Sequence, residues 1–210
     1  EVMPQSPSSL AMFVKGPAQY RAKYIDRVYV DDPNNPALLE GNRFHKAMED
    51  AVDKGVELPE EYKFMQPIVD LFESISDSDE GVVYTEQRAA VNKENRPVRF
   101  FDKDGLYRCM IDVAIVFPEK NAVLIVDYKT NKREGEYDIQ EVINYLCAAA
   151  TFNVETVVTA FHYVKLDRLV VSKFSTKTQS PKEVMLEENM RELREAHMTG
   201  HFPERPTALC

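Results

Sequence analysis

Two apolar segments, each interrupted by one aspartate, constrain the fold of this chain more than any other feature. Residues 109–117 and 123–130 are rich in β-branched side chains and are joined by the short connection 118–121, a pattern that predicts two neighbouring antiparallel strands. Asp112 interrupts the first segment and Asp127 the second. A carboxylate in an apolar sheet is costly unless its charge is compensated, so both aspartates require a partner.

A tight turn at residues 118–121 would fix how the two strands face each other. Pro118 then lies opposite Asn121, and counting outward along both strands places Asp112 opposite Asp127. Directly opposed Cβ atoms are about 4.5–5.5 Å apart, and like charges at that distance repel each other. Such a pair favours a hard divalent cation, Mg²⁺ or Mn²⁺. A bulge would shift the register by one residue and weaken this expectation.

Lys129 shares the face of Asp127, because alternate residues of a strand point the same way. An ammonium group there would orient an attacking water or stabilise charge that develops on a phosphate. We therefore expect Asp112, Asp127 and Lys129 to be catalytic. The structural alternative is that Asp127 and Lys129 form a simple ion pair, while backbone donors satisfy Asp112.

His45 and Glu86 are further candidates for the site. His45 lies on a helix predicted over residues 37–54, whose end is marked by Gly55. It is either a metal ligand or a core histidine. Glu86 is an additional acid in a predicted strand, and its alternative is an exposed ion pair with Arg88. The predicted inward stripe of the helix, on which Gly41 would allow a close approach, is Leu38, Gly41, His45, Met48 and Val52.

The remaining patterns predict an α/β fold with a central mixed sheet flanked by helices. Helices are expected over residues 6–26 with a break at Gly16 and Pro17, 37–54, 60–74, 137–152 and 181–199. Strands are expected over residues 82–91, 96–101, 106–117, 122–130, 156–165 and 168–175. One domain over residues 1–210 follows, with a mainly helical N-terminal segment over residues 1–80, a sheet core over residues 82–175 that includes helix 137–152, and a C-terminal helix over residues 181–199.

Composition limits the class of protein. A hydrophobic content of 44% over 210 residues is enough for one sizeable core. No apolar stretch approaches the roughly 20 residues that span a bilayer, and the first residues lack the order of a secretion signal. The three cysteines, Cys109, Cys147 and Cys210, form no CxxC pair, which fits a reducing compartment. We expect a cytoplasmic protein without membrane association, with Cys109 and Cys147 in its core.

The net charge of −9 argues against a broad duplex-binding surface, because affinity for phosphate comes from lysine and arginine. Two local basic segments would still guide a strand into a cleft. One covers residues 129–133 and includes Lys132 and Arg133, and the other covers residues 96–108.

Several of these residues, taken in order, resemble the motifs of the RecB-like and CRISPR-associated-exonuclease-like branch of the PD-(D/E)XK nuclease superfamily. The most specific motif is Asp-Tyr-Lys-Thr after an apolar strand, and the resemblance extends from about residue 6 to residue 210. The residues that carry it are Gly41, His45, Asp112, Asp127, Tyr128, Lys129, Thr130, Asn131 and Gln140.

The resemblance implies a restriction-endonuclease-like core and assigns roles to single residues. By resemblance, His45, Asp112, Asp127 and the backbone carbonyl of Tyr128 bind the metal, and Lys129 is the catalytic lysine. The helix that begins near Gln140 would grip the nucleic-acid strand. The family has a tyrosine four residues after this glutamine, whereas this chain has Asn144 there and Tyr145 next, so that role falls on Gln140 with Asn144 or Tyr145.

The first 20 residues resemble the opening of iron–sulfur members of that branch, but Gly16 stands where those members carry cysteine. The final residues, ending in Cys210, resemble the start of their C-terminal cysteine cluster. Because a cubane cluster usually needs four cysteines, we expect no iron–sulfur cluster in this chain.

The implied activity is a Mg²⁺- or Mn²⁺-dependent deoxyribonuclease, an exonuclease more than an endonuclease, that acts on DNA ends or single strands in recombination or repair. A helicase or recombination protein would be its partner. Two alternatives remain at this point. One is a structure-selective endonuclease of the same superfamily, and the other is an inactive DNA-binding module, against which the intact Asp112, Asp127 and Lys129 argue.

Overall fold

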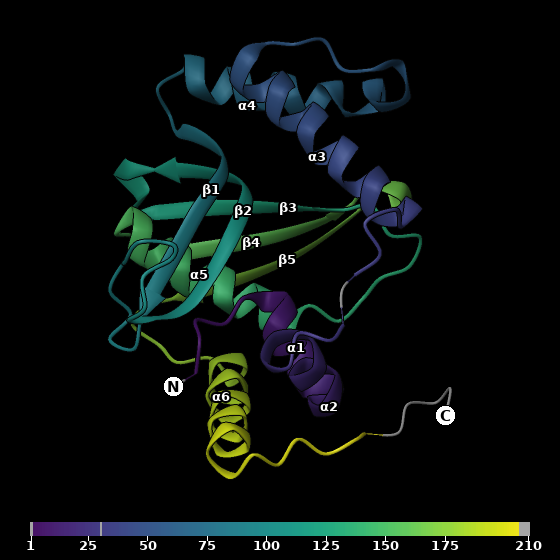
Figure 1. The fold of residues 1–210 in the computed structure, drawn as a ribbon. Helices are drawn as coiled ribbons and strands as arrows, with labels where there is room; N and C mark the ends of the chain where they lie inside the picture. Colours follow the sequence, from purple (N-terminus) through teal and green to yellow (C-terminus); the bar gives the residue numbers. More distant parts are fainter. Residues whose placement is uncertain (1, 30, 206–210) are drawn as a thin grey trace.

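The computed structural model describes residues 2–29 and 31–205, and its central feature is a five-stranded mixed sheet in the order β1-β2-β3-β4-β5 (Figure 1). The pairs β1/β2, β2/β3 and β4/β5 are antiparallel, and β3/β4 is parallel. The sheet confirms the predicted α/β fold. The strands are β1 (Val82–Asn92), β2 (Gly105–Phe117), β3 (Ala122–Lys129), β4 (Thr156–Tyr163) and β5 (Arg168–Ser175).

Helices cover both faces of the sheet. One face carries α3 and α4, and the other carries α1, α5 and α6. Because parallel neighbours need a crossover connection, α5 links β3 to β4. The helices are α1 (Pro7–Lys15), α2 (Pro17–Tyr20), the π-helix η1 (Arg21–Ile25), α3 (Pro36–Lys54), the 3₁₀ helix η2 (Glu60–Met65), α4 (Gln66–Asp77), the 3₁₀ turns η3 (Pro118–Lys120) and η4 (Val164–Leu166), α5 (Asp138–Phe152) and α6 (Pro181–Thr199).

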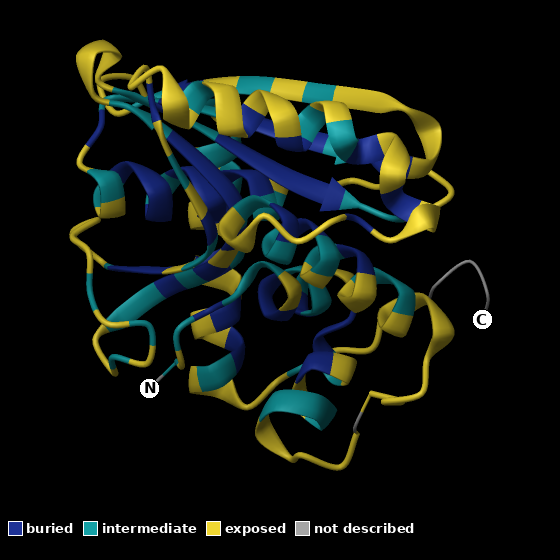
Figure 2. Cartoon of the chain, turned by 90° about the horizontal axis from the view of Figure 1, so that it is seen from above, coloured by how far each residue is buried: buried dark blue, intermediate teal, exposed yellow. Residues whose placement is uncertain are grey.

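The core is divided in two by the sheet. Figure 2 shows strands that are largely buried beneath helices whose outer faces are exposed. Val123 and Ile125 of β3 pack in the half formed with α1, α5 and α6. Val126 and Tyr128 of the same strand pack in the half formed with α3 and α4. The alternation of β3 is therefore regular, and Asp127 continues the face of Ile125 as predicted.

The register between β2 and β3 is the predicted one. Val113 pairs with Val126 and Phe117 with Ala122. The connection is the 3₁₀ turn η3, and Asn121 after it adopts a left-handed conformation with φ 47°. The ladder ends at the Val113–Val126 pair, so the two strands separate just before they reach the aspartates.

Both β1 and β2 reverse their faces partway along, which simple alternation does not predict. Ile111 packs with α1 and α5, whereas Val113, two residues later, packs with α3 and α4. In β1, Thr85 donates a hydrogen bond to Asp53 of α3 (2.6 Å), whereas Ala89 packs on the opposite face. Regular strands keep residues two apart on one face, so each strand must twist between these positions.

Three local predictions were wrong. Residues 96–101 are not a strand: only Pro97 forms a bridge, to Val91, and the chain then turns, with the Asp102 N–H donating to the Arg99 carbonyl (2.8 Å). Residues 60–74 are not one helix, since the tighter η2 comes first and α4 begins at Gln66. Leu38 is 47% exposed and lies outside the inward face of α3, which consists of Phe44, Met48 and Ala51.

The N-terminal helices pack against the segment that follows α6. The Phe13 ring lies edge-on to the Phe202 ring, with 6.4 Å between the ring centroids. The Tyr20 ring stacks on the same Phe202 ring, with 6.3 Å between the centroids. Cys109 and Cys147 are free and buried, as predicted. Leu209 and Cys210 lie outside the described residues. No helix in the described ranges is long and apolar enough to span a bilayer.

Candidate active site

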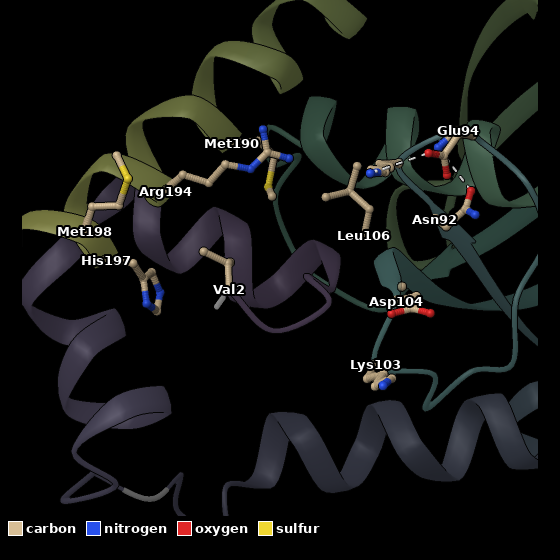
Figure 3. A pocket seen from close by; sticks show the side chains of 12 residues that line it. Val2, Asn92, Glu94, Lys103, Asp104, Leu106, Met190, Arg194, His197 and Met198 are labelled. Carbon is tan, nitrogen blue, oxygen red and sulfur yellow. Dashed lines mark hydrogen bonds and ion pairs between the residues drawn. The ribbon is translucent and has the colours of Figure 1, made fainter.

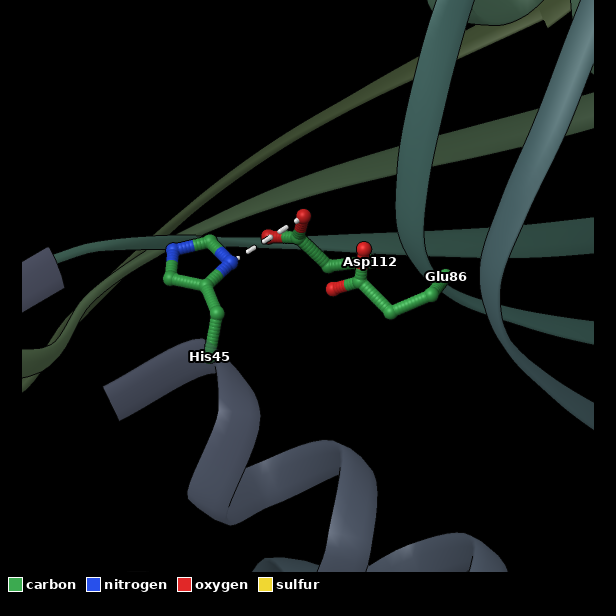
Figure 4. A group of neighbouring side chains, drawn as sticks. All are labelled: His45, Glu86 and Asp112. Atoms are coloured by element: carbon green, nitrogen blue, oxygen red, sulfur yellow. Dashed lines mark ion pairs between the residues drawn. The ribbon is translucent and has the colours of Figure 1, made fainter. Parts of the chain in front are cut away.

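Three side chains from three elements converge beside α3, next to the point where β2 separates from β3 (Figure 4). They are His45 of α3, Glu86 of β1 and Asp112 of β2, and one potential ligand atom of each lies within 4.8 Å of the others. The Nδ1 atom of His45 is 3.2 Å from the Oδ1 atom of Asp112. Among the described residues, this is the one group of three histidine, cysteine or acidic side chains with metal-ligand spacing.

The packing of α3 explains the position of His45. The helix begins where the Asn35 side chain accepts a hydrogen bond from the Ala37 N–H (3.0 Å), and it ends at Gly55 with φ 63°. Burial of Phe44 against Tyr128 leaves the next residue, His45, at the margin of the inward face. His45 therefore reaches the Asp112 carboxylate of β2 instead of packing in the core.

The helix also passes beside the end of β3, but Gly41 is not required there. A Cβ atom on Gly41 would lie 3.5 Å from the Thr130 hydroxyl, which is ordinary van der Waals contact. The expectation that the helix needs glycine at position 41 to approach its neighbour closely was therefore wrong.

Glu86 adopts φ 47°, which is uncommon for any residue other than glycine. The backbone on either side remains paired, Thr85 with Val113 and Gln87 with Ile111. The left-handed conformation is the point at which β1 reverses its faces. Strain of this kind costs about 1–3 kcal/mol and persists where the surrounding structure holds it in place.

Asp112 lies at the fork where β2 separates from β3. Its Oδ2 atom accepts a hydrogen bond from the Tyr128 N–H (2.8 Å). This side-chain bond connects β2 to β3 beyond the last backbone pair of the two strands, Val113–Val126. The other carboxylate oxygen, Oδ1, remains directed at His45. The carboxylate therefore connects the end of β3 to the group of His45 and Glu86.

Asp127 and Lys129 form a buried ion pair that Gln140 holds. The Lys129 Nζ atom lies 2.5 Å from the Asp127 Oδ1 atom, and the two side chains are only 12% and 6% exposed. Gln140 of α5 bridges the pair: its Oε1 atom accepts from Lys129 (2.7 Å) and its Nε2 atom donates to Asp127 Oδ2. The Asp127 Oδ1 atom has no aligned hydrogen-bond donor, so its contact with Lys129 is electrostatic.

Two aromatic rings complete the surroundings of the lysine. The Lys129 Nζ atom is 4.3 Å from the centroid of the Tyr137 ring and 5.1 Å from that of Phe161. Rings at these distances attract a cation through their quadrupoles. Neither aromatic residue was predicted to belong to the site, because an aromatic residue beside a strand is an ordinary packing pattern. Together with Gln140 they fix where the ammonium lies.

The acids of the site are poorly compensated. Burial, and after it the charge of Asp112, raises the pKa of the Glu86 carboxyl. The same two causes raise the pKa of Asp127 to about 7, although Lys129 opposes them. Burial lowers the pKa of His45, but its contact with Asp112 and the nearby acid charges outweigh burial, so the net shift is upward. Burial is the largest cause of both acid shifts, and the neighbouring acid charge adds to it; a bound cation would offset that charge.

Two hollows meet at this group. A cleft of about 750 Å³ is lined by Asp112, Asp127 and Lys129 and extends along α1. A second hollow of about 720 Å³ is lined by Glu86, His45 and residues of α3. His45 and Asp112 line both, so the candidate metal ligands lie where the two hollows join.

A third hollow, of about 760 Å³, lies elsewhere (Figure 3). Val2, Leu106 and side chains of α6, among them Arg194 and His197, line it. It contains no group with metal-ligand spacing among the described residues, so its volume does not make it the site.

A family model described as the PD-(D/E)XK nuclease superfamily matches residues 4–210. The chain belongs to this superfamily. No curated protein matches the chain. Among solved structures, the crystal structure of SSO0001 is similar over 98% of this chain and 80% of that one, with 13% identity and a TM-score of 0.43. A likeness this distant carries no inference about this chain.

PD-(D/E)XK nucleases use divalent metals to act on nucleic acid, and the donor set of this member fits such an ion. One imidazole nitrogen and two carboxylates already lie together in His45, Glu86 and Asp112. Carboxylate oxygens suit hard divalent cations, and imidazole is a common further ligand. Asp127 stands outside this group of three because Lys129 and Gln140 engage its carboxylate.

The predicted nucleic-acid contacts of the nuclease fall into three groups. Gln140 lines the cleft but is engaged by Asp127 and Lys129. Asn144 and Tyr145 are each 2% exposed, and the Tyr145 ring stacks on Phe174 (4.7 Å). Burial removes these two side chains from any surface that a strand could contact. Lys132 and Arg133 are exposed in the loop after β3.

The purely structural roles considered above for Asp112, Asp127 and Glu86 are only partly found in this nuclease. Asp127 does pair with Lys129, and Asp112 does accept a backbone hydrogen bond. The ion pair is buried, however, and Asp112 keeps one oxygen for His45. Glu86 has no ion pair with Arg88 in the described structure and faces the other acids instead.

Proposed function

We propose that this chain is a Mg²⁺- or Mn²⁺-dependent deoxyribonuclease of the RecB-like and CRISPR-associated-exonuclease-like branch, and that it acts as an exonuclease on DNA ends or single strands. The observation that carries the proposal is the convergence of His45, Glu86 and Asp112 beside the buried Asp127–Lys129 pair, where two hollows join. A purely structural ion pair would not require the neighbouring group of three.

In this proposal, His45, Asp112 and Asp127, with the backbone carbonyl of Tyr128, hold the cation, and Glu86 is an additional acid ligand. The cation supplies Lewis acidity that offsets charge on the phosphate oxygens. Gln140 positions the Lys129 ammonium and the Asp127 carboxylate relative to each other. The ammonium lies beside the acids, where it stabilises charge that develops on a phosphate or orients the attacking water.

We further propose that residues 1–210 act as one domain and that Lys132 and Arg133 contact the phosphate backbone. Gly16 offers no thiolate, so the nuclease would work without an iron–sulfur cluster, and Cys210 lies outside the described residues. Metal analysis of anaerobically purified chain should therefore find no iron. A recombination or helicase partner belongs to this proposal by resemblance alone.

The deciding experiment compares linear single-stranded DNA with a closed circle of the same sequence, with Mg²⁺, with Mn²⁺ and with chelator. The proposal expects metal-dependent degradation of the linear strand and a stable circle. Cleavage of the circle would instead show a structure-selective endonuclease. Metal-independent binding without cleavage of either strand would show a DNA-binding module.

A further inference from the structure

The connection between β1 and β2, with the adjoining parts of both strands, carries an aromatic and basic surface that the proposed function leaves unused. We call Arg88, Phe100, Phe101 and Arg108 the arginine–phenylalanine platform. The Phe100 and Phe101 ring centroids are 5.0 Å apart with the rings nearly perpendicular (88°). Phe101 is 75% exposed. A single exposed phenylalanine needs no explanation, so the inference depends on what surrounds it.

Both arginines of the platform lie against the aromatic rings. The guanidinium carbon is 5.8 Å from the Phe100 centroid for Arg88 and 5.5 Å for Arg108, and Arg108 is also 5.6 Å from the Phe101 centroid. Neither arginine has an acid within ion-pair distance among the described residues. In a chain of net charge −9, two such cations on one aromatic surface favour an anionic ligand.

The platform is continuous with the candidate active site. Phe100, Arg108 and Met110 line the same cleft as Asp112 and Lys129. Arg88 faces Met110 across the β1–β2 ladder. Met110 also borders the second hollow, which Glu86 lines. A ligand on the platform therefore has an open path to the acids.

The chemistry of the platform matches a single strand better than a duplex. Aromatic rings bind unpaired bases by stacking, and this tolerates any sequence because every base has a π-face. Arginine adds stacking and charge-assisted hydrogen bonds to phosphate. In a duplex the base faces are already stacked on each other. The two arginines would add affinity for phosphate beside the cation that the acids of the site would hold.

We propose that the arginine–phenylalanine platform is a base-stacking subsite for single-stranded nucleic acid. Phe101 stacks on a base, and Arg88 and Arg108 contact phosphates as the strand enters the cleft. The inference rests on the proposed nuclease function, because the platform serves the strand that the acids of the site would cleave.

The chain contains no tryptophan, so the variant Phe101→Trp carries a unique fluorescent reporter at the subsite. We expect a homothymidine strand, added with Ca²⁺ in place of Mg²⁺, to quench its emission saturably. The matched control is Phe64→Trp, because Phe64 is likewise exposed (59%) but lies on η2 and lines neither hollow of the site. Its emission should not change. Equal responses at the two positions, or none at Phe101→Trp, would overturn the proposal.

Affinities measured by anisotropy give a second test. Phe101→Ala should weaken binding of the single strand about tenfold, with a smaller effect on the matching duplex and none for Phe64→Ala. Arg88→Ala and Arg108→Ala should each reduce the slope of log affinity against log salt by about one, whereas Phe101→Ala leaves it unchanged. Single-strand affinity of Phe101→Ala within about twofold of wild type would refute the stacking role.

These binding measurements test the subsite independently of the proposed nuclease activity. Binding in Ca²⁺ does not require turnover, and cleavage by the wild-type chain is followed separately with Mg²⁺ or Mn²⁺. Absent cleavage with intact quenching at Phe101→Trp would defeat the nuclease proposal and keep the subsite. Wild-type cleavage without quenching would defeat the subsite and keep the nuclease.

Discussion

Glu86 of β1 and Asp112 of β2 lie at the same level of the sheet, between the pairs Thr85–Val113 and Gln87–Ile111, where both strands reverse their faces. The reversal brings the two carboxylates together with His45. The close approach of these three candidate ligands therefore follows from an irregularity that both strands share. Regular alternation of side chains would not have produced it.

Replacing an acid of the site by its amide should abolish metal-dependent cleavage while keeping the fold. Asp112→Asn and Asp127→Asn each remove one charged oxygen ligand from a group that repels itself without metal. In chelator, Asp112→Asn should melt at or above the wild-type temperature, because it removes a charge that acts on Glu86. Asp127→Asn should melt below wild type, because it leaves the buried Lys129 ammonium without its partner. Normal turnover in both variants would refute the assignment of these acids.

Lys129→Ala should separate metal binding from chemistry. The ammonium is not a cation ligand, so Mn²⁺ affinity should be largely kept, while single-turnover cleavage falls by about 10²–10³-fold through the loss of an electrostatic stabiliser. The control is Lys63→Ala on η2, which removes a lysine whose ion-pair partners, among the residues that the structure describes, are the surface acids Glu57 and Glu60. Single-turnover rates of Lys129→Ala equal to wild type would show that the lysine has only a structural role.

His45→Ala should weaken Mn²⁺ binding by at least about tenfold. Loss of a residue that only supports a ligand already lowers metal affinity by about that factor, and loss of the ligand itself should lower it at least as much. The melting temperature should change little. Its neighbour Phe44→Ala provides the opposite case, since Phe44 is 2% exposed and packs on Tyr62 and Tyr128. Titration calorimetry and thermal melts of both variants test this. A destabilised His45→Ala with unchanged metal affinity would identify a packing histidine.

Glu86→Gly should stabilise the metal-free protein more than Glu86→Gln does. Both remove the half-buried charge of Glu86, but only glycine adopts φ 47° without strain. We expect a difference of about 1 kcal/mol in the free energy of unfolding, measured by urea denaturation in chelator. A less stable Glu86→Gly would mean that the reversal of β1 carries no strain.

Phe13→Ala should destabilise the chain while leaving the metal site intact. Phe13 is 2% exposed and contacts both Tyr20 and Phe202, so the cavity should cost about 3–5 kcal/mol. Phe202→Ala, at a half-buried position, should cost less. Thermal melts measure the loss, and Mn²⁺ affinity should stay at the wild-type value. A loss of metal affinity in both variants would show that the N-terminal helices support the site directly.

Much of the fold and some of the site could be predicted from the sequence alone. The β2–β3 register followed from the short connection 118–121, because a tight turn leaves few ways to pair the strands. Asp127 and Lys129 were correctly placed on one face, since β3 is regular throughout. The bounds of α6 also agree with the pattern, because Ser180 caps its start and Gly200 follows its end.

The tertiary structure decided how these residues are used. Counting along the strands placed Asp112 opposite Asp127, but the ladder stops one residue short and Asp112 turns to Tyr128 and His45 instead. Gln140 was expected to grip the substrate and holds the Asp127–Lys129 pair. Local sequence sets periodicity and turn chemistry, whereas strand separation, face reversal and the approach of α3 depend on contacts between residues far apart in the chain. No pattern within one segment encodes such contacts, and the packing of the whole sheet against its helices determines them.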